Sequence, residues 1–271
     1  MKMKNLTICL TLAVLLGTTG TSWSADFEKG ASAYASGDFV TALQEWTPFA
    51  EQGNAYAQHN LGLMYYNGQG VPQNYKTAMK WYTLAAEQGN VLAQHNLGWM
   101  YHKGQGVPQN YKTAMKWCTL AAEQGHATAQ FNLGVMYRDG EGVSQDYKTA
   151  VKWLTLSGEQ GFADAQYNLG VMYHKGEGVL QHYKTAVKWY FLAAEQGYVS
   201  AQYNLGVMYY NGEGVLQDLI YAHMWGNIAA SNGSENGGKL RDEVAKLMTA
   251  TQIEKAQELA RECVRKEYKG C

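Results

Sequence analysis

Residues 54–89 read NAYAQHNLGLMYYNGQGVPQNYKTAMKWYTLAAEQG, and residues 90–125 read NVLAQHNLGWMYHKGQGVPQNYKTAMKWCTLAAEQG. The same 36-residue frame continues to residue 233. Its most regular marker is a tryptophan, at Trp81, Trp117, Trp153, Trp189 and Trp225. A period of this length is typical of stacked helical units, none of which can bury its apolar face alone. The sequence therefore predicts an all-α solenoid with five repeats over residues 54–233.

Each repeat reads as two helices joined by a glycine-rich linker, from about residue 55 to 66 and from about 75 to 87 in the first repeat. Gly68 permits the left-handed turn that ends the first helix, and Pro72 prevents its continuation. Side chains that can cap a helix stand where each second helix starts. These are Asn74, Asn110, Asp146, Asp218 and, as a weaker cap, His182. Within each pair we expect the helices to meet at Gly62, with Trp81 filling the space beside it.

The segments on either side of the five repeats are expected to cap the stack. Residues 25–53 keep a few repeat positions, among them Trp46, which indicates a degenerate N-terminal repeat. Residues 234–271 read as amphipathic helix and are expected to cover the exposed last repeat as a C-terminal helical cap. The apolar stripe of this cap is Leu240, Val244, Leu247, Ile253, Ala256, Leu259 and Ala260, with a capping box at Thr249 and Gln252.

The N-terminus has the three-part layout of a secretory signal peptide. A basic start is followed by an apolar run over residues 6–16, too short to span a membrane, and then by small polar residues. Ser22 and Ser24 favour cleavage before Ala25, so residues 1–24 form the expected signal peptide. The protein is therefore predicted to be exported, either to the periplasm or out of the cell.

Charge and hydropathy exclude two classes of partner. The chain has 22 Lys and Arg against 23 Asp and Glu, and loss of Lys2 and Lys4 with the signal peptide leaves 20 against 23, a net charge of −3. A protein that binds nucleic acid normally carries a basic excess. No stretch after residue 24 is apolar enough to span a bilayer. We therefore expect neither a nucleic-acid partner nor a membrane span.

The repeated residues resemble those of the Sel1-like repeats, a subclass of the tetratricopeptide repeats. In the first repeat they are Ala57, Leu61-Gly62, Tyr65, Gly68-x-Gly70-Val71, Lys76-x-Ala78, Trp81, Ala85-Ala86 and Gly89. The resemblance covers residues 54–233. It implies a curved, right-handed α-solenoid of helix-turn-helix units that presents its first helices on the concave side. It also implies a protein that binds other proteins rather than one that catalyses a reaction.

A stripe of variable residues on the first helices is the predicted binding groove. Positions 56, 59, 63 and 66 share one helix face because they are three or four residues apart. Aromatic residues and arginine are typical of the positions that dominate binding energy at interfaces. The row at position 63 fits a groove and packing between repeats equally well. The predicted contacts to a protein or peptide are Tyr56, His59, Tyr66, His95, Trp99, His102, Phe131, Arg138, Tyr167, His174, Tyr203 and Tyr210.

Motifs for catalysis or metal binding are missing from the sequence. A serine hydrolase acting on cell-wall or β-lactam substrates would need Ser-x-x-Lys, and only Thr77/Lys80 and its copies show that spacing. The linker carboxylates Glu141, Glu177 and Glu213 stand one per repeat, and each helix is roughly 10 Å wide, so they are too far apart to share a reaction. No two histidines are four residues apart, as a zinc site on a helix requires. We expect no catalytic residue, metal or cofactor.

Three cysteines follow the expected signal peptide. Cys118 stands where the first repeat has Tyr82, which indicates a small buried side chain. Cys263 and Cys271 would pair if the tail folded back at Gly270, and otherwise both are free thiols.

These observations favour a non-catalytic scaffold or adaptor that holds a protein or peptide in its groove. One alternative is a secreted binding factor directed at a host or a neighbouring cell. A less favoured alternative is a hydrolase of cell-wall or β-lactam substrates.

Overall fold

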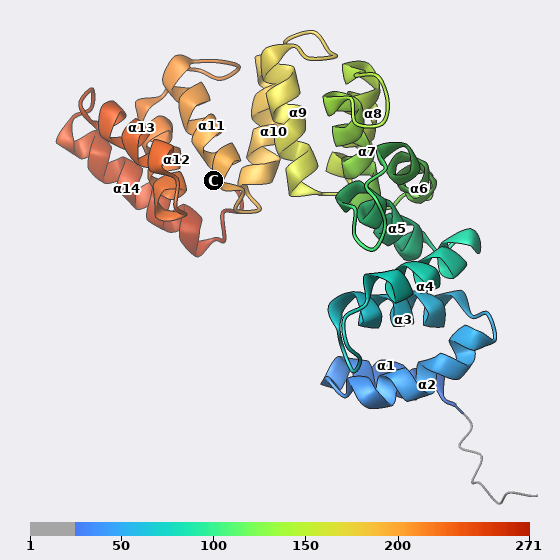
Figure 1. Ribbon diagram of the computed structural model, residues 1–271. Coiled ribbons are helices and arrows are strands. Elements are labelled where there is room, and N and C mark those ends of the chain that lie inside the picture. The colour runs from blue at the N-terminus through green and yellow to red at the C-terminus, as the bar shows by residue number, and fades with distance from the viewer. Residues whose placement is uncertain (1–24) are drawn as a thin grey trace, which may run out of the picture.

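The computed structural model describes residues 25–271, and this part of the chain contains 14 α-helices and no strand. Figure 1 shows the helices as a curved stack, with α1 and α2 at one end and α13 and α14 at the other. The all-α solenoid is confirmed. The expected signal peptide lies outside the described residues. None of the helices in residues 25–271 combines the length and apolarity needed to cross a membrane.

The helices follow one another in pairs, so that an odd-numbered helix opens each repeat. In chain order they are α1 (Phe27–Ser36), α2 (Phe39–Glu51), α3 (Ala55–Asn67), α4 (Tyr75–Glu87), α5 (Val91–Lys103), α6 (Tyr111–Glu123), α7 (Ala127–Asp139), α8 (Tyr147–Glu159), α9 (Ala163–Lys175), α10 (Tyr183–Ala194), α11 (Val199–Asn211), α12 (Leu219–Ser231), α13 (Glu235–Ala245) and α14 (Ala250–Arg265). The first and second helices of each predicted repeat are therefore confirmed to within a residue.

The two linker glycines have different tasks. Gly68 has a φ of 72° and ends α3 in the left-handed conformation, as predicted. Gly70 also has a positive φ, and a Cβ atom at this position would lie 2.8 Å from the backbone oxygen of Phe39. The equivalent glycines of the next four repeats meet the first residue of the preceding second helix in the same way. The second glycine therefore lets each linker rest on the previous repeat.

The predicted helix caps are confirmed. Asn74 accepts a hydrogen bond from the backbone N–H of Thr77 at 3.0 Å, and the equivalent side chains of the later repeats also cap their helices. His182 does so through Nδ1, which lies 3.2 Å from the N–H of Thr185. These bonds satisfy backbone groups that a helix start leaves without an intrahelical partner.

The residue beside Gly62 is Tyr82, so the prediction that Trp81 fills this space is wrong. A Cβ atom at Gly62 would lie 2.6 Å from the Tyr82 ring. Cys118, Leu154 and Tyr190 occupy the equivalent space in the next three repeats. One residue along a helix is a rotation of roughly 100°. Trp81 is therefore turned away from Gly62 and packs against the buried cluster of α2 and α3.

A hydrogen-bonded pair of amide side chains recurs in each of the five repeats and connects it to the preceding second helix, and the sequence analysis did not identify it. Gln58 is 4% exposed, donates to the backbone oxygen of Ala50 at 3.0 Å, and accepts a hydrogen bond from Gln88 at 2.7 Å. Buried polar groups require such partners. The arrangement recurs at Gln94/Gln124, Gln130/Gln160, Gln166/Gln196 and Gln202/Asn232.

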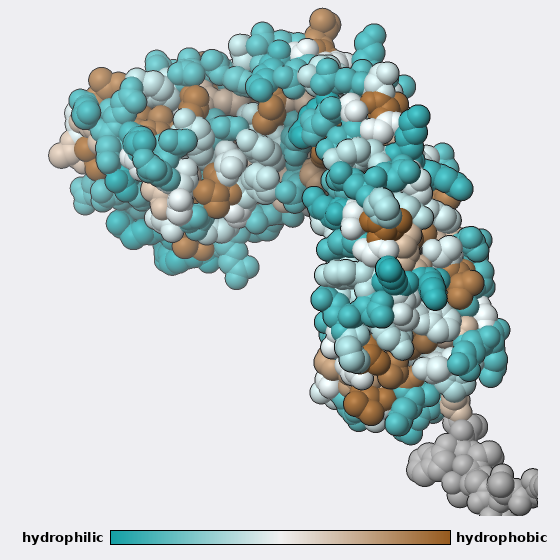
Figure 2. Space-filling view, in the orientation of Figure 1, coloured by the Kyte–Doolittle hydropathy of each residue, from teal (hydrophilic) through white to brown (hydrophobic). Residues whose placement is uncertain are grey.

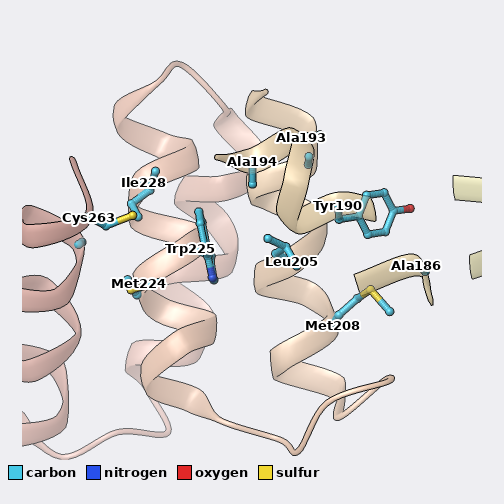
Figure 3. Close-up of a cluster of buried hydrophobic side chains, with 12 residues drawn as sticks. Ala186, Tyr190, Ala193, Ala194, Leu205, Met208, Met224, Trp225, Ile228 and Cys263 are labelled. Carbon is cyan, nitrogen blue, oxygen red and sulfur yellow. The ribbon is translucent and has the colours of Figure 1, made fainter. Parts of the chain in front are cut away.

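The last second helix, α12, is covered on two sides. Trp225 is 0% exposed and lies among buried residues of α10, α11, α12 and α14 (Figure 3). On another side Gly226 lets α13 approach, because a Cβ atom there would lie 3.2 Å from the backbone oxygen of Gly237. Leu240 of α13 then occupies the space beside Gly206 that Tyr82 occupies beside Gly62.

Most of the apolar stripe predicted for the C-terminal segment is buried or partly buried, and one residue is not. Leu240, Val244, Ala256 and Ala260 are buried. Leu247 is 59% exposed, so its expected burial is wrong. It lies in the turn after α13, where the helical periodicity on which the prediction depended has ended. The capping box of Thr249 and Gln252 is present at the start of α14.

The three cysteines of the described chain have different environments. Cys118 is 3% exposed and is the free cysteine. Cys263 and Cys271 form a disulfide with a Cα–Cα distance of 5.4 Å. The closed tail is also held by the Tyr268 hydroxyl, which donates to Asn232 at 3.1 Å, and by the N–H of Gly270, which donates to Glu195 at 2.7 Å.

Candidate functional site

Three hollows follow the face formed by the first helices α3, α5, α7, α9 and α11, which we call the first-helix face. The first hollow has a volume of about 350 Å³ and is lined by Leu63, Tyr66, Asn67, Tyr82, His95, Asn96, Trp99, Thr128 and Asn132. The second has a volume of about 270 Å³ and is lined by Trp99, His102, Lys103, Cys118, Phe131, Asn132, Val135, Met136, Arg138, Glu141 and Asn168. The third, also of about 270 Å³, is lined by Tyr167, Val171, His174, Lys175, Tyr190, Asn204, Val207 and Met208.

Trp99 is the wall between the first and second hollows, since it lines both. Its side chain is 38% exposed. The His102 ring stacks beside it at a centroid distance of 5.9 Å, and Lys103 Nζ lies 4.6 Å from the indole centroid. The other repeats carry Leu or Val at this position. The second repeat therefore presents the largest apolar side chain of this row.

The predicted groove residues at position 66 connect one repeat to the next. Tyr66 donates to Gln105 at 2.8 Å, whereas His102 and His174 lie 2.7 and 3.0 Å from Glu141 and Glu213. Glu141 and Glu213 therefore each contact one histidine of the preceding repeat.

Arg138, the position-66 residue of the third repeat, is held from two directions. It forms an ion pair with Asp139 at 2.7 Å and donates to Asn168 of the next repeat. The carboxylate of Asp139 raises the pKa of the guanidinium further above its usual value. The side chain is fixed in place at the edge of the second hollow.

The histidines at position 59 are less accessible than the sequence suggested. His59 is 8% exposed, and its Nε2 lies 3.3 Å from the amide nitrogen of Asn96. His95 Nε2 lies 3.4 Å from Asn132 in the same way. Burial lowers the pKa of both imidazoles, and nearby His126 helps to lower that of His95, to about 4. At neutral pH both rings are therefore uncharged.

The asparagine of each Asn-Leu-Gly triplet belongs to the site and was missed as a site residue. Asn96, Asn132, Asn168 and Asn204 each line at least one hollow. The sequence did contain an indication of their role, because a polar residue that recurs unchanged beside the variable stripe is expected to form hydrogen bonds there. Position 60 also lies four residues after position 56 and three before position 63, on the same side of the helix.

Two aromatic residues at position 59 contact the start of the following first helix. The Phe131 ring lies 5.1 Å from that of Phe162, and Tyr167 stacks on Tyr198 at 4.8 Å. Phe162 and Tyr198 occupy the N-cap positions of α9 and α11, which have no side-chain cap. Phe131 and Tyr167 still line the second and third hollows.

The predicted groove residues at the two ends of the solenoid differ in exposure. Tyr56 in the first repeat is 69% exposed. Tyr203 and Tyr210 in the fifth repeat pack against the buried cluster that includes Leu240 and Val244 of α13. The structure therefore leaves the first-helix face open in the first four repeats and covers part of it at the fifth.

The described residues contain no metal-binding cluster, and the free thiol among them is buried. Residues 25–271 hold no group of three or more His, Cys, Asp or Glu side chains placed to bind a metal ion. Cys118 lies at the bottom of the second hollow, and burial raises its pKa to about 12. Because the thiolate is the reactive form of cysteine, this thiol is a poor nucleophile at neutral pH.

Comparison with known proteins identifies the repeats. The Sel1 repeat model matches residues 55–90, 91–126, 127–162, 163–198 and 199–234. A search of curated proteins gave no match to the chain.

Two solved structures share the fold and a substantial part of the sequence. One is a protective antigen present in uropathogenic Escherichia coli strains, described as displaying an SLR fold, with 36% identity, a TM-score of 0.80, and coverage of 89% of this chain and 53% of that chain. The other is a Sel1 repeat protein from Oxalobacter formigenes, with 33% identity, a TM-score of 0.73, and coverage of 84% and 92%. The chain thus spans about half the length of the E. coli protein.

Proposed function

The chain belongs to the Sel1 repeat family, and we propose that it is an exported, non-catalytic scaffold that binds a protein or peptide on its first-helix face. Sel1 repeat proteins generally act as protein-interaction scaffolds, and the fold is typically non-catalytic. Members of one fold bind unrelated ligands, so the surface of this particular chain has to carry the argument.

The observation that supports this face is its row of open hollows. Apolar residues on the surface seen in Figure 2 occur in small groups among hydrophilic ones. On the first-helix face three hollows lie in sequence and include aromatic side chains from several repeats. Aromatic anchors surrounded by polar side chains are typical of interface hot spots. A partner that lies along this face would contact several repeats at once.

Two features support export. The first 24 residues have the composition of a signal peptide. Cys263 and Cys271 form a disulfide, a bond that persists mainly in oxidising compartments such as the periplasm or the exterior of the cell. The remaining cysteine, Cys118, is buried.

A second candidate function is a secreted factor that binds a host or neighbouring cell. The observation in its favour is that the E. coli protein of the same fold is described as a protective antigen. Cell fractionation separates the two candidates, because a scaffold of the envelope stays in the periplasm, whereas a secreted factor accumulates in the culture fluid.

The test of the proposed function is affinity capture from crosslinked cell envelopes and culture fluid. The bait is the tagged protein, compared with a first-helix variant that combines Arg138→Ala and Tyr167→Ala. A matched control combines Leu84→Ala and Leu156→Ala on the second helices α4 and α8, where each leucine is 45% exposed. Circular dichroism establishes that all three proteins are folded.

The expected result is a partner that the original protein and the second-helix control retain and that the first-helix variant loses. A partner that all three proteins capture equally would place binding elsewhere on the molecule. If the second-helix control alone lost the partner, the assignment of the first-helix face would be wrong.

A further inference from the structure

We propose that the two hollows beside Trp99 accept two apolar side chains of one extended peptide, and that Lys103 pairs with a carboxylate of the same peptide. This inference rests on the proposed function and adds the chemistry of the partner. It depends on the shape of the two hollows, on their separation, and on the charge left unpaired at their edge.

The shared wall makes the two hollows parts of one site. Trp99 and Asn132 line both of them. An indole that is 38% exposed offers a large apolar area at a small cost in side-chain entropy. The asparagine amide beside it can bond to a peptide backbone. A ligand that enters both hollows therefore has to pass over Trp99.

The volumes favour side chains over a whole small molecule. The hollows measure about 350 and 270 Å³. Sites for drug-sized ligands are roughly 300–1,000 Å³, so the first hollow lies at the lower end of that range and the second lies just below it. Each suits one apolar side chain, such as Leu, Met or Phe.

The Trp99 ring between the two hollows sets the distance between the two side chains. The first hollow lies mainly between α3 and α5, and the second mainly between α5 and α7. An apolar group on each side of the Trp99 indole contacts the ring at about 3.5–4 Å, so the two groups lie about 8 Å apart. A peptide in the polyproline II conformation advances about 3.1 Å per residue with three residues per turn, so residues three apart lie on one side of the peptide and about 9 Å from each other. The two apolar residues of the peptide should therefore be about three positions apart.

The charges at the second hollow indicate that the peptide also carries an acidic residue. His102 is paired with Glu141 at 2.7 Å, and Arg138 with Asp139 at 2.7 Å. Lys103 is exposed, contacts the Trp99 ring, and forms no ion pair among the described residues. Within residues 25–271, Lys103 therefore lacks the acidic partner that His102 and Arg138 have. An acidic residue of the peptide, next to its second apolar side chain, would complement the charge of Lys103.

The fourth repeat provides an internal control for this argument. Val171 and Lys175 stand at the positions of Trp99 and Lys103, and both line the third hollow. Valine offers less apolar area than tryptophan, and Lys175 already lies 3.8 Å from Glu177. The same two substitutions at this repeat should therefore affect the peptide far less.

The test is selection from a phage-displayed library of random peptides on the purified protein, followed by affinity measurements with synthetic copies of the enriched sequences. We expect enriched peptides to share two apolar residues about three positions apart and an adjacent Asp or Glu. Trp99→Ala should weaken their binding about tenfold or more, as at an interface hot spot. Lys103→Glu should weaken it about threefold at low salt and less at high salt. Val171→Ala and Lys175→Glu should leave it unchanged.

Three results would overturn the inference. Peptides that lose affinity with Val171→Ala and Lys175→Glu but not with Trp99→Ala would move the peptide site to the third hollow and leave the proposed function intact. Peptides insensitive to all four substitutions would contradict a site on the first-helix face and so count against the proposed function as well. A selection that enriches no sequence over the Trp99→Ala protein would reject this peptide chemistry, while the capture experiment would still decide the function.

Discussion

The middle of the solenoid, α3 to α10, and its C-terminal end, α11 to α14, follow the same repeat pattern but differ in what covers it. Trp81, Trp117 and Trp153 of the middle repeats remain partly exposed, whereas Trp225 at the end is 0% exposed. The first-helix face carries hollows from α3 to α11, but at α11 the helix α13 covers part of this face.

This difference shows how one repeat sequence yields two kinds of surface. In a middle repeat the first-helix face meets solvent, so its residues are available to a partner. In the fifth repeat Gly226 stands where the other repeats have Tyr82, Cys118, Leu154 and Tyr190, and Leu240 of α13 takes the space beside the first helix. The cluster of Leu240 and Val244 also packs against Tyr203 and Tyr210, so the end of the stack covers side chains whose equivalents in the middle line the open hollows.

The largest expected effect comes from removing the buried tryptophan at the end. Trp225→Ala should reduce the free energy of unfolding by about 4 kcal/mol, because truncating a fully buried aromatic residue loses its packing and leaves a cavity. Trp81→Ala should cost about 2 kcal/mol, since this side chain buries less apolar area. Urea unfolding monitored by circular dichroism measures both. If both substitutions reduced the free energy of unfolding equally, the end and the middle would not differ in how much their tryptophans stabilise the fold.

Acid should destabilise the middle repeats through His95. The pKa of its imidazole is lowered to about 4 in the folded protein, by burial first and His126 second. The unfolded chain takes up this proton near pH 6.5, so stability is complete above that pH and falls as the pH drops from about 6.5 to 4. The loss is about 3 kcal/mol at most. His95→Gln should show a smaller difference between urea midpoints at pH 7 and pH 4.5, and an unchanged difference would contradict this source of acid sensitivity.

Reduction of the disulfide should affect the end and spare the middle. Opening the short loop between Cys263 and Cys271 should cost about 2.5 kcal/mol in local stability, on the loop-entropy model. Amide exchange should rise in residues 266–271, among them Gly270, whose N–H donates to the Glu195 carboxylate. Exchange in α3 to α8 should stay the same. Cys263→Ser combined with Cys271→Ser should reproduce the effect, and a change in the middle repeats would show that the regions are coupled.

The smallest pair of effects distinguishes two neighbouring glycines of α13. A Cβ atom at Gly237 would lie 2.7 Å from that of Ala229, so Gly237→Ala should push α13 from α12 and destabilise the end by about 1–2 kcal/mol. At Gly238 the nearest atom is 3.8 Å away, and Gly238→Ala should stabilise α13 by about 0.5–1 kcal/mol through helix propensity. Thermal unfolding measures both, and two shifts of the same sign would contradict the close contact at Gly237.

Much of the fold could be predicted because its signals are local. The positive φ of Gly68, the cap at Asn74 and the capping box at Thr249 each depend on residues within a few positions of one another. The repeat period then gave the number of units without knowledge of their packing. Leu247 was assigned wrongly because the periodic stripe was extended past the end of a helix.

The candidate site was predictable only in outline. The sequence identified a variable face on the first helices, and Trp99, His102, Phe131 and Arg138 do meet at one hollow. It could not identify the contacts that close parts of that face. The pair of His102 with Glu141 joins residues 39 positions apart, and the cover over Tyr203 comes from a helix outside the repeats.

Local sequence signals thus predicted the helices of the five repeats and their ends, because hydrogen bonding within a helix and the conformational limits of Gly and Pro act over a few residues. Packing between helices sets the burial of His59, the position of Tyr82 rather than Trp81 beside Gly62, and the cover over the fifth repeat. These outcomes depend on how helices from different repeats rotate and approach one another. A rotation of one residue position changes which side chain is core and which is free to bind.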